Sequence, residues 1–291
     1  MRMILVHGIS QEGKSEKIIL DEWLTPLRAA LAKQGSDPIG RLSRIEAVFY
    51  GDLLGSNSSP WLKSETLPMG AEEASDDFDD FAVEALEAMA ISIGVTRAEI
   101  EAEAADTTVP MGKGPHKKWL KAIARAVEKI SPLKGAMALR VLGEAHAYIR
   151  NKYVHNLVNN NIRPVFEDDE PAIIISHSLG TVVSYALLRE FERNNRSRQS
   201  PLWLTLGSPL GIDVVRKSFT KPRIRPSGVS RWVNAADPED FVALHSALSA
   251  PDFGPDIENF SDVENGPENP HGIAGYLSDV RVAKAIIEAI P

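Results

Sequence analysis

The chain of 291 residues contains no cysteine, so disulfide bonds, a thiol nucleophile and cysteine-ligated metals are excluded. It also has no basic excess, because 32 Lys and Arg residues against 40 Asp and Glu residues give a formal net charge of −8. This balance disfavours a nucleic-acid-binding surface. No metal pattern of the type H-E-x-x-H occurs either. We therefore expect no nucleic-acid partner, no metal and no cofactor.

Long apolar runs are also missing from the chain. No segment approaches the roughly 18 consecutive apolar residues of a membrane-spanning helix. The first apolar run, residues 3–6, has the length and composition of a strand and not those of a leader. These features predict a soluble, cytoplasmic protein, with leaderless export as the alternative.

Among the features that are present, the run 173–183 is the most informative, with the sequence I-I-I-S-H-S-L-G-T-V-V. A short β-branched stretch passes into small-x-Ser-x-Gly and then into a helix-compatible segment, which is the context of a nucleophile elbow centred on Ser178. Small residues are needed two positions before and after the serine because the turn is tight and strained. Gly180 meets this need, and Ser176 stands where glycine is more usual. The pattern indicates a serine hydrolase; the alternative is a serine that only caps the helix.

Two backbone N–H groups are candidates for binding the oxyanion that forms when a serine attacks a carbonyl carbon. The N–H of Leu179 follows the serine at the start of the predicted helix, where the helix dipole is positive. The N–H of Ile9 follows His7-Gly8 at the end of the first predicted strand, and the glycine lets the backbone turn toward the site. We expect the side chains of His7 and His177 to be structural, with that of His177 pointing away from the nucleophile.

An acid and a general base are expected after the serine, in the order Ser, acid, His. Asp237, Glu239 and Asp240 follow the predicted strand 230–234. Asp240 is preferred because Val242 follows it after one residue, a pattern that hydrolases of this kind often show. Asp237 is the alternative acid, since its place before a proline also suits a turn or a helix cap.

His271 is the candidate base. It lies in the loop before the last predicted helix, after the candidate acids. A loop position there allows the imidazole to reach back over the sheet toward Ser178. His245 is the main rival, but it falls in a helix-like run directly after the candidate acid.

Strand and helix patterns alternate along much of the chain. The opening has a strand at 3–6, an amphipathic helix at 16–34 and a strand at 45–50, and further strands are predicted at 202–206 and 230–234. The order strand, helix, strand implies parallel strands joined by a crossover helix. We therefore predict an α/β fold with a mostly parallel central sheet flanked by helices.

Three further segments complete this pattern. One helix is predicted from about 138 to 159, and a last helix from about 275 to 289. The segment 250–270 is rich in Pro, Gly, Asp and Asn, which predicts a loop.

Within a single domain spanning residues 1–291, the segment 56–134 interrupts the alternation with helical patterns and no convincing strand. Thirteen acids and one base lie between 65 and 110, and seven bases and one acid between 113 and 134, so its two halves carry opposite charge. We interpret it as a helical insertion that forms a cap or lid and offers a surface for peripheral membrane or protein contact. Its amphipathic stretch would line an acyl pocket or touch lipid, or alternatively pack on the core: Trp119, Leu120, Ile123, Val127 and Ile130.

Together these segments resemble the α/β-hydrolase superfamily, in particular its bacterial lipase-like and esterase-like members. The resemblance rests on Val6-His7-Gly8-Ile9, Ser176-His177-Ser178-Leu179-Gly180, Gly207-Ser208-Pro209, Asp240-Phe241-Val242 and His271. It covers residues 1–55 and 135–291 and leaves out the insertion.

The resemblance implies an α/β-hydrolase fold in which Ser178 is the nucleophile, His271 the general base and then acid, and Asp240 the acid that orients it. Ile9 and Leu179 would supply the oxyanion hole. The implied function is hydrolysis of a carboxylic ester, of a small-molecule or lipid-like acyl substrate, through an acyl-serine intermediate.

Several other functions remain open. The same triad serves an amidase, a thioesterase or a peptidase, and a catalytically silent binding scaffold is an alternative of a different class. Residues 8–15, G-I-S-Q-E-G-K-S, also match the phosphate-loop pattern of nucleotide-binding proteins directly after the first strand. Against it, His7-Gly8 already has a part in the hydrolase interpretation, and Asp52 is only a weak substitute for a magnesium-binding aspartate.

Overall fold

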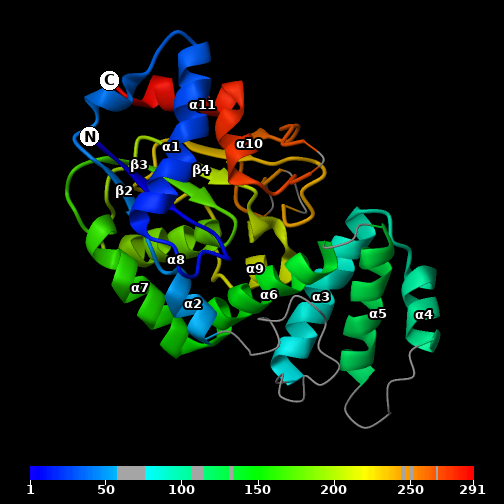
Figure 1. Cartoon of the computed structure of the whole chain (residues 1–291). Helices are drawn as coiled ribbons and strands as arrows, with labels where there is room; N and C mark the ends of the chain where they lie inside the picture. Colours follow the sequence, from blue (N-terminus) through cyan, green and yellow to red (C-terminus); the bar gives the residue numbers. More distant parts are fainter. Residues whose placement is uncertain (58–75, 107–114, 131–133, 244–246, 250–251, 267) are drawn as a thin grey trace.

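The computed structural model describes residues 1–57, 76–106, 115–130, 134–243, 247–249, 252–266 and 268–291. Its centre is one six-stranded, all-parallel sheet with the strand order β2-β1-β3-β4-β5-β6 (Figure 1). The strands are β1 (Arg2–Val6), β2 (Ile45–Val48), β3 (Ala172–His177), β4 (Trp203–Leu206), β5 (Trp232–Ala235) and β6 (Glu258–Phe260). The predicted α/β fold class with a parallel sheet and flanking helices is confirmed.

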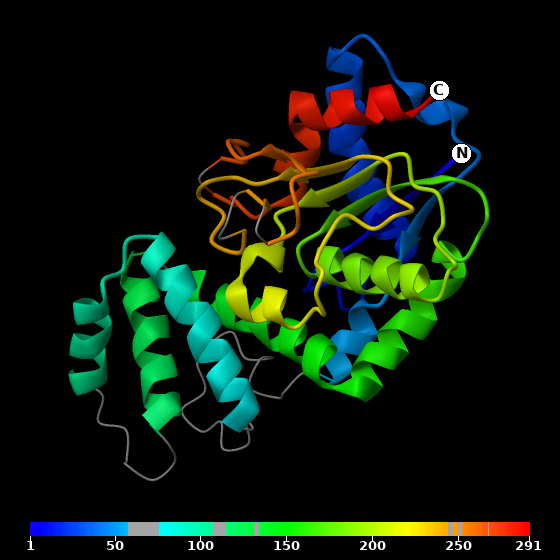
Figure 2. The ribbon, with the colours of Figure 1, turned by 180° about the vertical axis from the view of Figure 1, so that it is seen from behind.

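Helices cover both faces of the sheet (Figures 1 and 2). One layer consists of α1 (Glu16–Lys33), α10 (Ile273–Ser278) and α11 (Val280–Ala289). The other contains α2 (Gly51–Asn57), α6 (Lys134–Arg150), α7 (Lys152–Phe166) and α8 (Leu179–Arg193). Side chains alternate along β1 and so contribute to both layers. Met3 and Leu5 pack in the core cluster that includes α1 and α11, whereas Ile4 and Val6 pack in the cluster that includes α6, α7 and α8.

The carboxyl ends of β1 and β3 mark the point where the chain changes direction across the sheet. The path from β1 through α1 leads to β2 at one edge, and the path from β3 through α8 leads to β4 toward the other edge. Val6 lies opposite Ser176, and Ser176 lies opposite Thr205, so the residues that follow these strands meet at one edge. Ligands of open parallel sheets bind at such a switch point.

Three helices of the insertion form a group next to α6, away from the sheet: α3 (Asp76–Ser92), α4 (Arg97–Asp106) and α5 (Pro115–Ile130) (Figure 1). On α5, Leu120, Ile123 and Val127 are buried in the core cluster that also contains side chains of α3 and α4, and Trp119 packs against it in part. For these side chains the structure shows the packing alternative. Residues 58–75 and 107–114 and the side chain of Ile130 lie outside the described part, and the cap or lid remains a prediction.

Some element boundaries differ from the predicted pattern. The predicted helix 138–159 is two helices, because the Asn151 side chain accepts hydrogen bonds from the first N–H groups of α7 and so caps it. Asp279 separates α10 from α11 in the same way. Strand β6, of three residues, lies in the segment predicted as a loop, and among the described residues it pairs only with β5. Short 3-10 and α-helical segments complete the description: η1 (Pro38–Arg41), η3 (Pro209–Gly211) and α9 (Asp213–Lys217).

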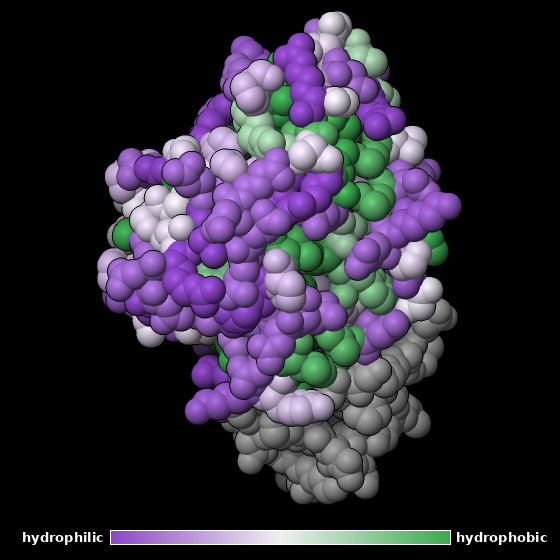
Figure 3. Space-filling model, turned by 90° about the vertical axis from the view of Figure 1, so that its left-hand side faces the viewer, coloured by the Kyte–Doolittle hydropathy of each residue, from purple (hydrophilic) through white to green (hydrophobic). Residues whose placement is uncertain are grey.

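The described surface carries apolar residues among hydrophilic ones, and Figure 3 shows a band of them on one side of the molecule. Among the residues that the structure describes, the large exposed apolar side chains come from five separate segments: Ile18, Ile91, Tyr153, Ile224 and Val280. Among the described helices, none has both the length and the apolar character needed to cross a bilayer.

Candidate active site

Ser178 forms the turn between β3 and α8. Its backbone has φ 52° and ψ −128°, and a positive φ is strained for any residue other than glycine. Its N–H donates to the carbonyl oxygen of Leu206 on β4 (3.0 Å), and Thr181 donates to its carbonyl oxygen through the N–H (3.0 Å) and the hydroxyl (2.7 Å). The Ser178 hydroxyl makes no capping hydrogen bond to α8, so the helix-cap alternative does not describe it.

Two glycines allow the backbone to pack tightly around this turn. A Cβ at Gly180 would lie 2.3 Å from the carbonyl oxygen of Val6, and a Cβ at Gly8 would lie 2.6 Å from the Cβ of Ser178. Real Cβ atoms do not approach other atoms so closely, so only glycine fits at either position. The end of β1 is therefore held directly against the turn that carries the serine.

Ser176 replaces the usual first glycine of the elbow without leaving a polar group unpaired. Its hydroxyl is buried, lies 2.8 Å from the Ser184 hydroxyl of α8, and accepts a hydrogen bond from the indole N–H of Trp203 (3.1 Å). A small side chain with two partners satisfies both the space and the hydrogen-bonding demands of the site.

His271 joins the serine to an acid. Its Nε2 lies 2.9 Å from the Oγ of Ser178, and its Nδ1 lies 2.8 Å from the Oδ2 of Asp240. An ionised carboxylate can only accept, so Nδ1 carries the proton and Nε2 is left to accept the serine O–H. The structure thus brings together the three residues predicted from the sequence, in the orientation that proton transfer from Ser178 requires. The rival His245 lies outside the described residues.

Asp240 is buried and has several donors around its carboxylate. Its Oδ1 accepts the N–H groups of Val242 (2.9 Å) and Ala243 (3.4 Å), and its Oδ2 accepts the hydroxyl of Tyr276 (2.6 Å) as well as His271. Burial opposes ionisation, but His271 and these hydrogen bonds outweigh it and hold the pKa of Asp240 below its usual value.

Asp237, the alternative acid, has a different set of partners. Its Oδ1 accepts the N–H of Glu239 (2.7 Å), and its Oδ2 accepts the N–H of Asn265 (2.7 Å). Both carboxylate oxygens are therefore used to fix the turn after β5 and the loop after β6. The structure places Asp240, and not Asp237, against the imidazole.

His177 contacts the site more closely than the sequence indicated. Its Nε2 lies 2.9 Å from the backbone oxygen of His271, and the two ring centroids are 4.8 Å apart. Burial, together with the neighbouring His271, lowers the pKa of His177 to about 3, so the neutral ring can only donate through Nε2–H here. His177 thus helps to fix the backbone that carries the candidate base.

The two predicted oxyanion donors belong to the two segments that meet at the serine. Leu179 is the first residue of α8, and Ile9 follows the glycine that touches Ser178. Both residues are buried, and within the described chain neither N–H has a hydrogen-bond acceptor. Unpaired N–H groups beside a nucleophile are suited to an oxyanion that forms there.

His7 ties the end of β1 to the end of β2. Its Nε2 accepts the N–H of Tyr50 (3.1 Å), which leaves Nδ1 to donate to the carbonyl oxygen of Gly8 (2.7 Å). Burial lowers the pKa of His7 to about 4, so the ring stays neutral in this network. Its contacts are structural, as expected from the sequence.

The loop with the phosphate-loop pattern already uses its main donors within the protein. The N–H of Gly13 donates to Asp52 (2.8 Å), that of Lys14 donates to the carbonyl oxygen of Gln11 (3.1 Å), and the Lys14 ammonium pairs with Glu22 (2.7 Å). Phosphate binding by such a loop needs these groups free. This arrangement argues against phosphate binding by the loop.

Helix α6 contacts the loop 8–15. Arg140 pairs with Glu12 (2.7 Å), and Glu144 accepts the backbone N–H of Ser10, a residue with φ 60°. Glu144 is buried, and burial, followed by the nearby charge of Glu12, raises its pKa to about 7. A buried carboxyl thus contacts the residue that follows Ile9.

Glu144→Gln should stabilise the protein at pH 8 and have little effect at pH 5. Because the folded-state pKa of Glu144 is raised, the folded protein binds more protons than the unfolded chain between about pH 4.5 and 7, and stability falls as pH rises through that window. Glutamine removes this cost, so the gain at pH 8 should be about 1–3 kcal/mol. Urea unfolding at both pH values measures it.

The control for this variant is Glu101→Gln at an exposed position of α4, which should show no difference between the two pH values. A Glu144→Gln protein less stable than wild type at pH 8 would mean that the ionised carboxylate, paired with Arg140, stabilises the fold.

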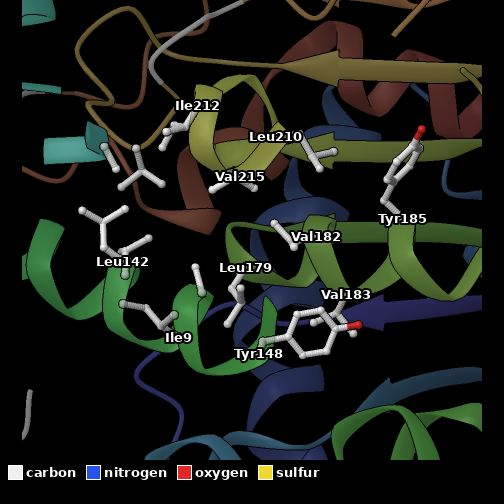
Figure 4. Packing of buried hydrophobic residues seen from close by; sticks show 14 of the residues in the cluster. Ile9, Leu142, Tyr148, Leu179, Val182, Val183, Tyr185, Leu210, Ile212 and Val215 are labelled. Atoms are coloured by element: carbon white, nitrogen blue, oxygen red, sulfur yellow. The ribbon is translucent and has the colours of Figure 1, made fainter. Parts of the chain in front are cut away.

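Leu179, the residue after Ser178, packs in a buried apolar cluster to which several elements contribute. Ile9, Leu142 of α6, Leu179, Ile212 and Val215 of α9 belong to one buried cluster (Figure 4). The Ser178 side chain itself is completely buried. A substrate can therefore reach the Ser178 hydroxyl only after part of the protein around it moves.

Sequence reasoning missed Tyr276, whose hydroxyl contacts the acid. Tyr276 lies on α10, and its spacing there suits an ordinary core position, so no pattern in the sequence distinguishes it.

Within the described residues there is no group of three or more side chains that could hold a metal ion. Comparisons of the chain with protein-family models, curated proteins and solved structures found no match.

Proposed function

We propose that this chain is a serine hydrolase of the α/β-hydrolase type that cleaves a carboxylic ester through an acyl-serine intermediate. The observation that carries the proposal is the continuous hydrogen-bonded chain from Ser178 Oγ through His271 to Asp240. It lies at the switch point of the parallel sheet, on a strained turn between strand and helix.

In the first half of the reaction, Ser178 Oγ attacks the carbonyl carbon of the ester while His271 Nε2 takes the hydroxyl proton. The carbonyl oxygen becomes an oxyanion, which the N–H groups of Ile9 and Leu179 bind at the positive end of α8. Asp240 keeps the imidazole oriented and stabilises its positive charge. His271 then gives its proton to the departing alcohol, and the acyl group remains on the serine.

In the second half, His271 takes a proton from water, and the resulting hydroxide attacks the acyl carbon. The same two N–H groups bind the second oxyanion. Collapse of this intermediate breaks the bond to Ser178 Oγ, which recovers its proton from His271, and the carboxylic acid leaves.

An acyl or lipid-like substrate is the preferred class. The support for it is the buried apolar cluster that contains Leu179, the neighbour of the nucleophile, together with Ile9, Leu142, Ile212 and Val215, since such side chains suit an acyl chain. The apolar face of α5 does not contribute to this support because α5 packs against α3, α4 and α6.

The test is to treat the folded wild-type protein with a fluorophosphonate over pH 6–9 and to identify the modified residue by mass spectrometry. Modification of Ser178 is expected, followed by turnover of one or more p-nitrophenyl esters of graded chain length. Matched amide and thioester substrates separate an esterase from an amidase or thioesterase. Lys14→Ala should react like wild type.

A folded protein that is neither modified at Ser178 nor active on any of these substrates, across this pH range, would contradict the proposal. ATP binding that is lost in Lys14→Ala and kept in Ser178→Ala would support the nucleotide-binding alternative instead.

A further inference from the structure

The hydroxyl of Tyr276 lies between two groups of the loop after β5. It accepts the backbone N–H of Asp237 (3.1 Å) and lies 2.6 Å from the Oδ2 of Asp240. The residue is completely buried, on the helix that begins just after His271. Because the oxygen is already an acceptor from Asp237, its single proton is directed to Asp240.

Tyr276 and His271 donate to the same oxygen. The Oδ2 of Asp240 accepts the Tyr276 hydroxyl and also the Nδ1–H of His271 (2.8 Å). A hydrogen bond from an O–H group to a carboxylate is short and strong, and it draws negative charge away from the oxygen. Burial and the charge of Asp240 raise the pKa of Tyr276 well above its usual value, so the phenol remains a donor over the working pH range.

The backbone is adapted to bring these groups together. Gly207, at the end of β4, has φ +56°, and a Cβ there would lie 2.9 Å from Asp240 Oδ2, 3.0 Å from the Tyr276 ring and 3.2 Å from His271 Nδ1. A larger residue would push apart the acid, the base and the tyrosine. The close contact of the three is therefore built into the turn after β4.

We propose that Tyr276 is a positioning residue for the hydrolytic reaction. Its hydroxyl holds the Asp240 carboxylate against His271 and limits how strongly that carboxylate attracts a proton onto the imidazole. This inference rests on the proposed function. The titratable groups that face His271 are Asp240 from the loop after β5, His177 from β3, Ser178, and Tyr276 from α10.

Tyr276→Phe removes the hydroxyl and keeps the buried ring. Without its second donor, Asp240 attracts the imidazolium more strongly, so the acid limb of the pH–rate profile should move up by about 0.5–1 pH unit. The looser carboxylate should lower the fluorophosphonate rate at pH 7 by roughly five- to twentyfold, and ester turnover should lose kcat with KM within about twofold.

Tyr185→Phe is the matched control. Tyr185 is also a buried tyrosine, and its hydroxyl donates to the carbonyl oxygen of Ile224 (3.2 Å) away from the reacting groups. The acid limb of the pH–rate profile of Tyr185→Phe should coincide with that of wild type. An unchanged acid limb in Tyr276→Phe, or a rate loss that is equal at all pH values, would overturn the inference and leave only a structural tyrosine.

A second measurement covers the case in which Tyr276→Phe does not fold. Incorporating 3-fluorotyrosine at the five tyrosines makes the phenol a stronger donor, so the acid limb should move down by a few tenths of a pH unit. No shift, or an upward shift, would reject the inference. If wild type itself does not react at Ser178, the proposed function fails; if it reacts and these shifts are absent, only the role of Tyr276 fails.

Discussion

Ser178→Ala and His271→Ala will each lower kcat on an ester substrate by roughly 10⁴- to 10⁶-fold, and the double variant will be no slower than either one. In the proposed mechanism the two residues act in one step, since the 2.9 Å contact between Oγ and Nε2 would serve a single proton transfer. Once one partner is missing, the other has nothing left to activate. The residual rate should come from binding and from the oxyanion donors.

The measurements are the single-turnover rate of ester cleavage and the steady-state kcat and KM, each for both single variants and for the double variant. Ser184→Ala and His155→Ala are the matched controls, since Ser184 contacts Ser176 and His155 contacts Asn159, both away from the imidazole. These controls should retain activity within a fewfold of wild type. Additive losses in the double variant would show that Ser178 and His271 act independently, contrary to the mechanism.

Local patterns in the sequence were sufficient to predict the central elements of the fold and the chain order of the candidate site residues. The β-branched run before Ser178 and the glycine after it predict a strand, a tight turn and a helix, and the structure has each of them. His271 could be selected from its loop position after the acid. Choices of this kind depend on chain order and turn geometry, which neighbouring residues determine.

Contacts between distant segments could not be predicted in the same way. Strand β6 has three residues and no apolar run, and it exists because β5 offers it a partner. The amphipathic face of α5 fits a lipid contact and a helix contact equally well by pattern, and only the packing against α3 and α4 distinguishes them. Tyr276 meets Asp240 through the path of the chain after β6, which no local spacing encodes.

The burial of Ser178 affects how the site would operate. Its side chain has no surface exposed to solvent. Exclusion of water strengthens the hydrogen bonds that bind an oxyanion and protects an acyl intermediate. For the proposed reaction it also implies an opening step, so the fluorophosphonate rate should saturate at a value that opening determines.

Asp240→Asn will lower kcat by roughly 10³- to 10⁴-fold without preventing folding. The amide cannot satisfy its neighbours in either orientation. With its oxygen at the Oδ1 position, facing the N–H groups of Val242 and Ala243, its NH₂ group meets the donors of His271 and Tyr276. The imidazole must then accept at Nδ1 and carry its proton on Nε2, which can no longer accept the serine proton.

Asp237→Asn is the matched comparison, because it makes the same substitution three residues earlier. Its carboxylate accepts from Glu239 and Asn265, so the variant should lose about 1–3 kcal/mol of stability from a mispaired N–H. Its kcat should stay within about tenfold of wild type. The reverse result, with Asp237→Asn inactive and Asp240→Asn active, would move the acid to Asp237. It would require the chain to rearrange after β5, because the carboxylate of Asp237 has both oxygens engaged away from His271.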